Sequence, residues 1–203
     1  MVKAAVVVLA AGGSTRLGRP KQLLPYRGTT LLAHAAGAAL AARIGPVLVV
    51  LGADADQMPG ALVGLDVHTV VNAAWRSGMA GSVCAGLAAM EQRWPGTLAV
   101  VLTTCDQPLI QPKTLRALAE HVTGGATIAA CGYGGAVGVP AAFARSRFGE
   151  LLALRGEEGA RRILLAHATA IAVVDCPEAA VDVDTETDAR DLARFGVRKD
   201  TDS

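Results

Sequence analysis

Residues 5–21 read AVVVLAAGGSTRLGRPK, an apolar run that passes directly into a loop of small residues and cations. The apolar run shows little polar alternation, which is typical of a parallel strand buried on both faces. Glycines in the loop let backbone N–H groups approach phosphate oxygens closely, and Arg16 and Lys21 add positive charge. The stretch therefore predicts a buried strand that ends in a polyphosphate-binding loop.

This loop fits neither of two common phosphate-binding motifs. A P-loop requires Gly-Lys followed by Ser or Thr, but Gly18 is followed by Arg19 and Pro20. A dinucleotide fingerprint requires Gly-x-Gly-x-x-Gly, and Gly12-Gly13 with the later Gly18 does not supply that spacing. The first residues also resemble part of a signal peptide, but the continuation into a cationic loop favours the buried strand. A third class of nucleotide-binding loop is indicated.

Further short apolar runs alternate with helical patterns along the chain. The expected strands are 5–9, 47–51, 67–71, 98–103, 127–130 and 171–174, and the expected helices are 31–42, 82–93 and 112–122. Such alternation predicts an α/β fold with three layers, Rossmann-like and doubly wound around a mostly parallel sheet. The length of 203 residues favours a single domain over 1–203, in which about 195–203 is a polar tail.

Composition excludes several functional classes. The formal net charge is +1 and no Lys/Arg cluster alternates with aromatics, so we expect no nucleic-acid partner and no membrane partner. No apolar stretch reaches the length of a membrane span, and a cytoplasmic location is expected. The cysteines form no Cys-x-x-Cys pair, which argues against a zinc or redox motif. Small-molecule partners are favoured.

Strand-end carboxylates predict a metal site. Asp106 follows an apolar strand by a few residues, and Mg²⁺ prefers one or two carboxylates together with phosphate oxygens. Asp182 and Asp184 point to the same side if their segment is extended, so packing decides which of them reaches the metal. Alternatively, Asp106 caps a turn, and Asp184 lies at a helix start with Asp188. A metal site places several carboxylates close together, and they repel one another when no metal is bound. If Asp106 and Asp184 form such a site, neutralising one of them is expected to leave the stability of the protein unchanged or raise it.

Two other segments are expected near the ligand. Asn72 follows a strand, and Gly78 to Ser82 precedes a helix, where free N–H groups favour an anion. A simple helix cap at Ser82 is nearly as well supported. The glycine-rich segment 131–140 predicts a mobile loop or hairpin beside the acceptor pocket.

Several motifs together resemble those of the molybdenum cofactor cytidylyltransferases, within the wider glycosyltransferase-A-like NTP transferase fold. The motifs are the loop of residues 9–21, Asn72-x-x-Trp75-x-x-Gly78-Met79-x-x-Ser82, Cys105-Asp106-Gln107-Pro108, Gly138-x-Pro140, Gly156-x-x-Gly159-Ala160-Arg161 and Asp182-Val183-Asp184-Thr185. The resemblance implies that the nucleobase lies near Ala10 and Ala11. It also favours Asp184 over Asp182 as the second metal ligand, and it implies that Arg161 holds the acceptor.

The resemblance implies a Mg²⁺-dependent transfer of a nucleoside monophosphate from an NTP, with CTP favoured, to a phosphorylated acceptor such as molybdopterin. The implied metal ligands are Asp106 and Asp184, and the implied catalytic residues are Arg16, Lys21 and Asp106. The implied ligand-binding residues are Leu9, Ala10, Ala11, Gly12, Gly13, Ser14, Arg16, Lys21, Asn72, Gly78, Ser82 and Arg161. A molybdoenzyme or its chaperone is a candidate recipient. The alternatives are a guanylyl or sugar-phosphate nucleotidyltransferase of the same fold, or a non-catalytic nucleotide-binding protein.

Overall fold

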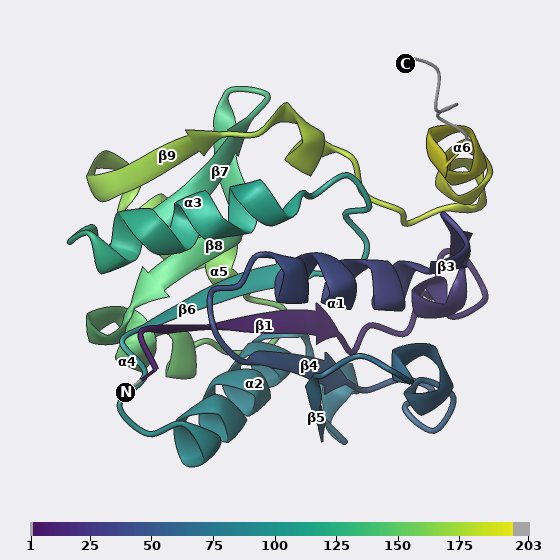
Figure 1. Cartoon of the computed structure of the whole chain (residues 1–203), viewed down its shortest axis with the longest axis horizontal. Coiled ribbons are helices and arrows are strands. Elements are labelled where there is room, and N and C mark those ends of the chain that lie inside the picture. Colours follow the sequence, from purple (N-terminus) through teal and green to yellow (C-terminus); the bar gives the residue numbers. More distant parts are fainter. Residues whose placement is uncertain (1, 197–203) are drawn as a thin grey trace.

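The computed structural model describes residues 2–196 and is built around one seven-stranded sheet (Figure 1). The strand order is β5-β4-β1-β6-β8-β7-β9. The strands are β1 (Ala4–Ala10), β4 (Val47–Leu51), β5 (His68–Val71), β6 (Ala99–Thr104), β7 (Ile128–Tyr133), β8 (Ala136–Ala144) and β9 (Ile171–Asp175). Every pairing within the sheet is parallel except the two made by β8, so the sheet is mostly parallel, as predicted.

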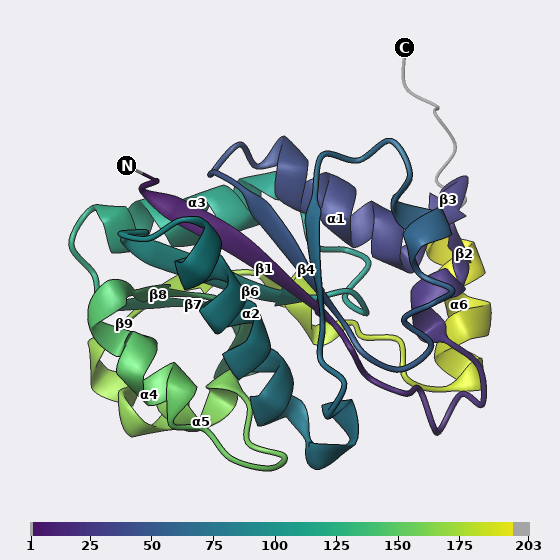
Figure 2. The same ribbon diagram turned by 90° about the horizontal axis from the view of Figure 1, so that it is seen from below.

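Helices cover both faces of the sheet, with α1 and α3 above it and α2, α4 and α5 below it in Figure 2. They are α1 (Leu31–Ala41), α2 (Met79–Arg93), α3 (Pro112–Thr123), α4 (Phe148–Leu152) and α5 (Ala160–Ala166). All seven residues of β1 are buried. Val6 and Val8 pack into the core between the sheet and helices α1 and α3, and Val7 and Leu9 pack into the core between the sheet and α2. Burial on both faces explains the unbroken apolar run, and the three-layer α/β prediction is confirmed.

The strand order reverses direction at the pair β1 and β6. From β1 the chain runs outward through β4 to β5, and then returns to place β6 on the other side of β1. In such sheets ligands bind beyond the carboxyl ends of the strands at this switch point. The glycine loop follows β1, and Asp106 follows β6, so the topology brings both predicted motifs to one edge.

Several elements differ from the sequence prediction. Segment 131–140 forms a hairpin, one of its two predicted forms, but the second arm is β8, which was not among the predicted strands; Gly134 and Gly135 lie at positive φ in the turn. Glycine tolerates this backbone conformation, whereas most other residues do not. Helix α2 begins at Met79, three residues before the predicted start at Ser82. The short helices α4 and α5 were not predicted.

A third, smaller core joins distant parts of the chain. Helix α6 (Glu186–Gly196) packs against the two-stranded ribbon of β2 (Pro25–Tyr26) and β3 (Thr29–Thr30). The shared buried residues are Leu17, Leu24, Tyr26, Leu31, Val183 and Leu192. This core draws the acidic segment before α6 toward the glycine loop. Of the predicted tail, residues 195 and 196 close α6 and residues 197–203 lie outside the described chain. Along residues 2–196, no helix is long and apolar enough to cross a bilayer.

Candidate nucleotide-binding site

A cavity of about 320 Å³ lies at the carboxyl ends of β1 and β6. Of the predicted site residues, its lining includes Leu9, Ala10, Ala11, Gly12, Gly13, Lys21, Gly78, Ser82 and Asp106. Ser14, Arg16, Asn72, Arg161 and Asp184 are not among its lining residues. Lining residues that the sequence did not single out as ligand contacts include Thr15, Gln22, Trp75, Arg76, Met79 and Glu157. The cavity size is in the range that suits a small-molecule ligand.

Gln22 holds the glycine loop in shape. Its side chain is 1% exposed, and its amide Nε2 donates to the carbonyl oxygens of Ala10 and Gly12, each at 2.8 Å. Ser14 supports the other end of the loop, because its hydroxyl accepts a hydrogen bond from the backbone N–H of Lys21 at 3.0 Å. With its inward-facing carbonyls satisfied by one amide, the loop is held in one shape before a ligand arrives.

We expect Gln22→Met to lower the free energy of unfolding by about 2–6 kcal/mol. Methionine fills a similar volume but leaves two carbonyl oxygens without a donor, at a cost of about 1–3 kcal/mol each. Chemical denaturation of the variant and the parent measures the difference. Thr123→Ala removes a hydroxyl that donates to backbone at the end of α3, away from this loop, and serves as a control for generic hydrogen-bond loss. Equal stability of Gln22→Met and the parent would contradict the role of this amide.

The Lys21 ammonium joins the two predicted metal ligands. Its Nζ lies 2.5 Å from Oδ2 of Asp106 and 2.7 Å from Oδ1 of Asp184. Arg16 binds the other oxygen of Asp184 at 2.6 Å, with its own side chain 70% exposed. Residues separated by as many as 168 positions in the chain thus meet in one cluster, and the two carboxylates converge on a single point.

The charges in this cluster shift the pKa values of its members. Burial would lower the pKa of Lys21, but the adjacent carboxylates of Asp106 and Asp184 outweigh it and raise the pKa above its ordinary value. Burial would likewise raise the pKa of Asp184, but hydrogen bonds and charge from Lys21 and Arg16 lower it. For Asp182, burial and the negative charges of Asp184 and Asp106 raise the pKa. Packing therefore pairs Asp184, and not Asp182, with the cations.

A capping box explains why Asp184 is free to face Lys21. The Thr185 hydroxyl accepts from the backbone N–H of Asp188 at 3.2 Å, and the Asp188 carboxylate accepts from the backbone N–H groups of Asp184 and Thr185. Thr185 and Asp188 therefore cap α6, and the Asp184 carboxylate is left for the cations. The adjacent Val183 donates its N–H to the carbonyl of Asp106 at 3.0 Å, which anchors the segment beside the other carboxylate.

The Asp106 side chain is not a turn cap in this structure. Within residues 2–196, the hydrogen bond recorded for its carboxylate comes from Lys21. Gln107 stabilises the turn instead, because its amide Nε2 donates to the carbonyl oxygens of Val139 and Ala179 at 3.0 and 2.8 Å. The strand end therefore presents Asp106 toward the ligand edge, while its neighbour ties β8 to the segment after β9.

Trp75 forms the wall beneath the glycine loop. A Cβ on Gly13 would lie 2.7 Å from the Trp75 ring, and a Cβ on Gly52 would lie 2.8 Å from the Trp75 Cβ. Both distances are too short for real Cβ contacts, so the loop approaches the indole as closely as it does only because position 13 is glycine. The Arg76 guanidinium stacks on this indole, 4.4 Å from the ring centroid.

Asn72 and Ser82 are bonded to each other, and of the two only Ser82 lines the cavity. The Asn72 amide donates to the Ser82 hydroxyl at 3.1 Å, and its carbonyl accepts from the backbone N–H of Ala74 at 3.1 Å. Asn72 is 7% exposed and connects the end of β5 to α2, while Ser82 also lines the cavity. Because α2 begins at Met79, the predicted cap at Ser82 is wrong. Arg161 lies exposed on α5, outside the cavity lining.

The residues of this edge fit a divalent cation. Two carboxylates converge on one ammonium, so the cluster of Lys21, Asp106 and Asp184 carries one net negative charge before Arg16 is counted. Carboxylate oxygens that leave other positions open to phosphate are the ligands that Mg²⁺ uses in such sites. Within residues 2–196, no group of three or more His, Cys, Asp and Glu side chains has metal-holding geometry, so a closed all-protein metal cage is not found in that range.

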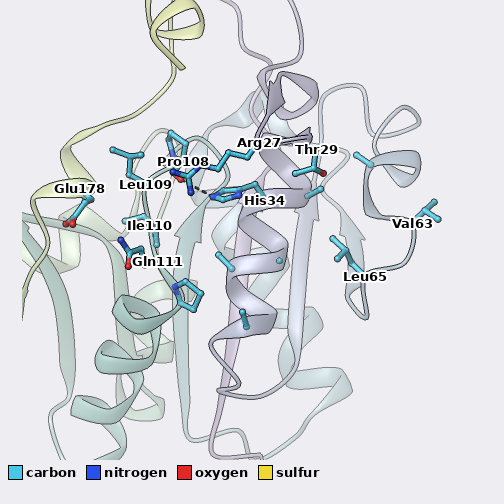
Figure 3. A pocket seen from close by; sticks show the side chains of 16 residues that line it. Arg27, Thr29, His34, Val63, Leu65, Pro108, Leu109, Ile110, Gln111 and Glu178 are labelled. Atoms are coloured by element: carbon cyan, nitrogen blue, oxygen red, sulfur yellow. Dashed lines mark hydrogen bonds between the residues drawn. The ribbon is translucent and has the colours of Figure 1, made fainter. Parts of the chain in front are cut away.

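A larger cavity of about 740 Å³ lies on the outer surface of α1, away from the carboxylates. Figure 3 shows His34 pointing from α1 toward Pro108, while Val63 and Leu65 lie on the other side of the helix. The His34 Nε2 lies 3.0 Å from the carbonyl oxygen of Pro108, and burial lowers the His34 pKa. The lining is largely apolar and contains neither the glycine loop nor Asp106, so the smaller cavity is the candidate site.

A glycine loop and a strand-end carboxylate at the switch point of a doubly wound sheet define a nucleotide-binding α/β protein. The family follows from the sequence of this same region. Residues 6–171 match the MobA-like NTP transferase domain, and the chain belongs to this family.

Individual relatives agree with the family assignment. The crystal structure of Rv0371c from Mycobacterium tuberculosis H37Rv superposes with a TM-score of 0.82 at 34% identity, over 95% of this chain and 98% of that one. The chain is 44% identical over 121 residues to nicotine blue oxidoreductase from Paenarthrobacter nicotinovorans, which covers 58% of this chain and 57% of the relative. It is 35% identical over 160 residues to the bifunctional protein GlmU from Agrobacterium fabrum, which covers 76% of this chain and 34% of that protein. The chain thus spans about half or less of these curated relatives.

Proposed function

We propose that this protein transfers a nucleoside monophosphate, CMP by preference, from an NTP to a phosphorylated small molecule of the molybdopterin type and releases pyrophosphate. The observation that supports the proposal is the convergence of Asp106, Asp184 and Lys21 beside the glycine loop. The preferred metal is Mg²⁺, and a manganese complex of Rv0371c is consistent with a divalent ion in the family. The proposed location is cytoplasmic, and a molybdoenzyme or its chaperone is the proposed recipient of the product.

The residues of the site suit an in-line displacement at the α-phosphorus. A phosphate oxygen of the acceptor attacks, the bond from the α-phosphorus to its bridging oxygen breaks, and the electron pair leaves with pyrophosphate. The acceptor oxygen is already ionised near neutral pH, so positioning and charge neutralisation do the work and no general base is needed. The glycine loop, Arg16 and Lys21 would hold the phosphates, and Arg161 would hold the acceptor. A divalent ion at Asp106 and Asp184 would supply charge neutralisation and orientation of phosphate oxygens.

We expect CTP to support faster pyrophosphate release than GTP, ATP or UTP. The small Ala10-Ala11 pair is the cytidylyl-like feature of the loop, and both residues line the cavity. The measurement is pyrophosphate release from each NTP with Mg²⁺ or Mn²⁺ and a molybdopterin or sugar-phosphate acceptor. A preference for GTP would move the protein to a guanylyltransferase. Release with a sugar phosphate alone would replace the acceptor but keep the reaction class.

A second candidate is an oxidoreductase, which the 44% identity with nicotine blue oxidoreductase favours. The cluster of Lys21, Asp106 and Asp184 speaks for the transferase, because hydride transfer has no need of paired strand-end carboxylates around an ammonium. The two candidates are separated by incubating the protein with nicotine blue and a reduced nicotinamide dinucleotide and following the absorbance of both. Reduction of the dye without pyrophosphate release in the first assay would favour the oxidoreductase.

A further inference from the structure

The positive charges predicted for phosphate binding are already engaged by carboxylates. Lys21 is bound to Asp106 and Asp184, and Arg16 is bound to Asp184 and does not line the cavity. A nucleoside triphosphate carries several negative charges. The positive charges of Lys21 and Arg16 are partly neutralised by their carboxylate partners, so a further cation is needed to balance the phosphates. The cavity lining holds one other cation, Arg76. Within residues 2–196, no carboxylate is recorded as a partner of its guanidinium.

Arg76 is positioned by the aromatic ring next to it in sequence. Its guanidinium lies over the Trp75 indole at 4.4 Å from the centroid. Gly13 on the phosphate loop and Gly52 at the end of β4 leave room for Trp75 only because each lacks a side chain. The guanidinium is planar, weakly hydrated and permanently charged, so it stacks on an indole while its N–H groups stay available to an anion. Trp75 therefore connects the shape of the glycine loop to the position of a cation.

We propose that Arg76 is a third phosphate-binding cation of the nucleotide site, held by Trp75 as its positioning residue. It contacts a phosphate oxygen of the NTP within the cavity that Asp106 also lines, and this inference rests on the proposed NTP-binding function. Lys21 and Arg16 are coupled to the carboxylates, whereas Arg76 is free to bind the phosphates before any ion pair is broken. Arg76 does not contact the base or the sugar of the nucleotide.

The test compares nucleotide binding by the parent and four variants, using titration calorimetry with cytidine, CDP and CTP in the presence of Mg²⁺. We expect Arg76→Gln to bind CTP about ten-fold or more weakly and cytidine equally well. We expect Trp75→Leu to match Arg76→Gln, and Trp75→Phe to retain most of the affinity because an aromatic platform remains. Arg145→Gln is the matched control, because Arg145 also stacks on an aromatic ring, that of Phe148, but pairs with Glu91 away from the cavity.

The outcomes separate this inference from the proposed function. A parent protein that binds none of the three ligands overturns the NTP-binding function itself. A parent that binds CTP with Arg76→Gln equally tight overturns the role of Arg76 alone. Equal losses for cytidine and CTP in Arg76→Gln would place the contact at the nucleoside and overturn the phosphate contact. A loss of CTP affinity in Trp75→Leu but not in Arg76→Gln would mean that the indole acts without Arg76, which overturns the positioning role of Trp75. Melting temperatures of all variants check that each is folded.

Discussion

We expect turnover to fall at least a hundred-fold in both Asp106→Asn and Asp184→Asn, because each substitution removes one of two carboxylate charges from the site proposed to hold the metal. Asparagine keeps the shape of the side chain, so the loss reports charge and not packing. The measurement is pyrophosphate release at saturating CTP and Mg²⁺. Retained turnover in either variant would rule out that carboxylate as a metal ligand.

The structure reverses the expected effect of these substitutions on stability. Crowded carboxylates would gain stability on neutralisation, but Asp106 and Asp184 are each bound to Lys21 in this structure. Removing one charge breaks a partly buried ion pair, and we expect a loss of about 1–2 kcal/mol, which is several degrees in melting temperature. Asp182→Asn is the matched control. Its raised pKa reflects burial and nearby negative charge, so its neutralisation leaves stability unchanged or raises it and spares turnover.

We expect Lys21→Met to tighten Mn²⁺ binding about ten-fold or more in the absence of nucleotide while turnover falls at least a hundred-fold. The Lys21 ammonium occupies the point on which both carboxylates converge, so it competes with a divalent ion for the same oxygens. Its removal also takes away a charge proposed to hold the phosphates. Free Mn²⁺ measured by electron paramagnetic resonance during titration gives the affinity without any assay of activity.

Arg16→Met separates this competition from a general effect of lost positive charge. Arg16 binds only Asp184 and its side chain is 70% exposed, so solvent screens its interaction and the change in Mn²⁺ affinity should be much smaller. Melting curves add a second readout. Without added metal, Lys21→Met should melt at a lower temperature than the parent. Added Mn²⁺ should raise the melting temperature of Lys21→Met by more than it raises that of the parent. Unchanged Mn²⁺ affinity in Lys21→Met would show that the ammonium and the metal use different positions.

The sequence predicted those parts of the fold in which local pattern and burial agree. The strand of β1 is buried on both faces, so its composition alone marks it as a central parallel strand. Strand β8 escaped prediction because it contains glycine and Pro140 and lies in a segment whose turn signals dominate. The start of α2 was misplaced because its first turn has no side-chain cap, and Ser82 looked like one.

The candidate site shows a similar division. Gly13 and Lys21 belong to a short contiguous motif, so the sequence predicted that they face the ligand. The structure places both in the cavity lining. Gln22 was missed because its function is to bond two backbone carbonyls, which leaves no sequence signal beyond a polar residue beside a loop. The ion pairs of Lys21 were missed because they depend on tertiary contacts across 85 and 163 positions.

The site is also assembled from both ends of the described chain, which determines when it can form. Lys21 precedes its partner Asp184 by 163 positions, and α6 must dock on the β2–β3 ribbon before the second carboxylate is held in place. Contacts with so large a sequence separation form late, because most of the loop-closure entropy is lost before they contribute. The glycine loop, by contrast, is held by contacts of Gln22 that span only 10 and 12 positions, so it can take its shape before the two carboxylates meet at Lys21.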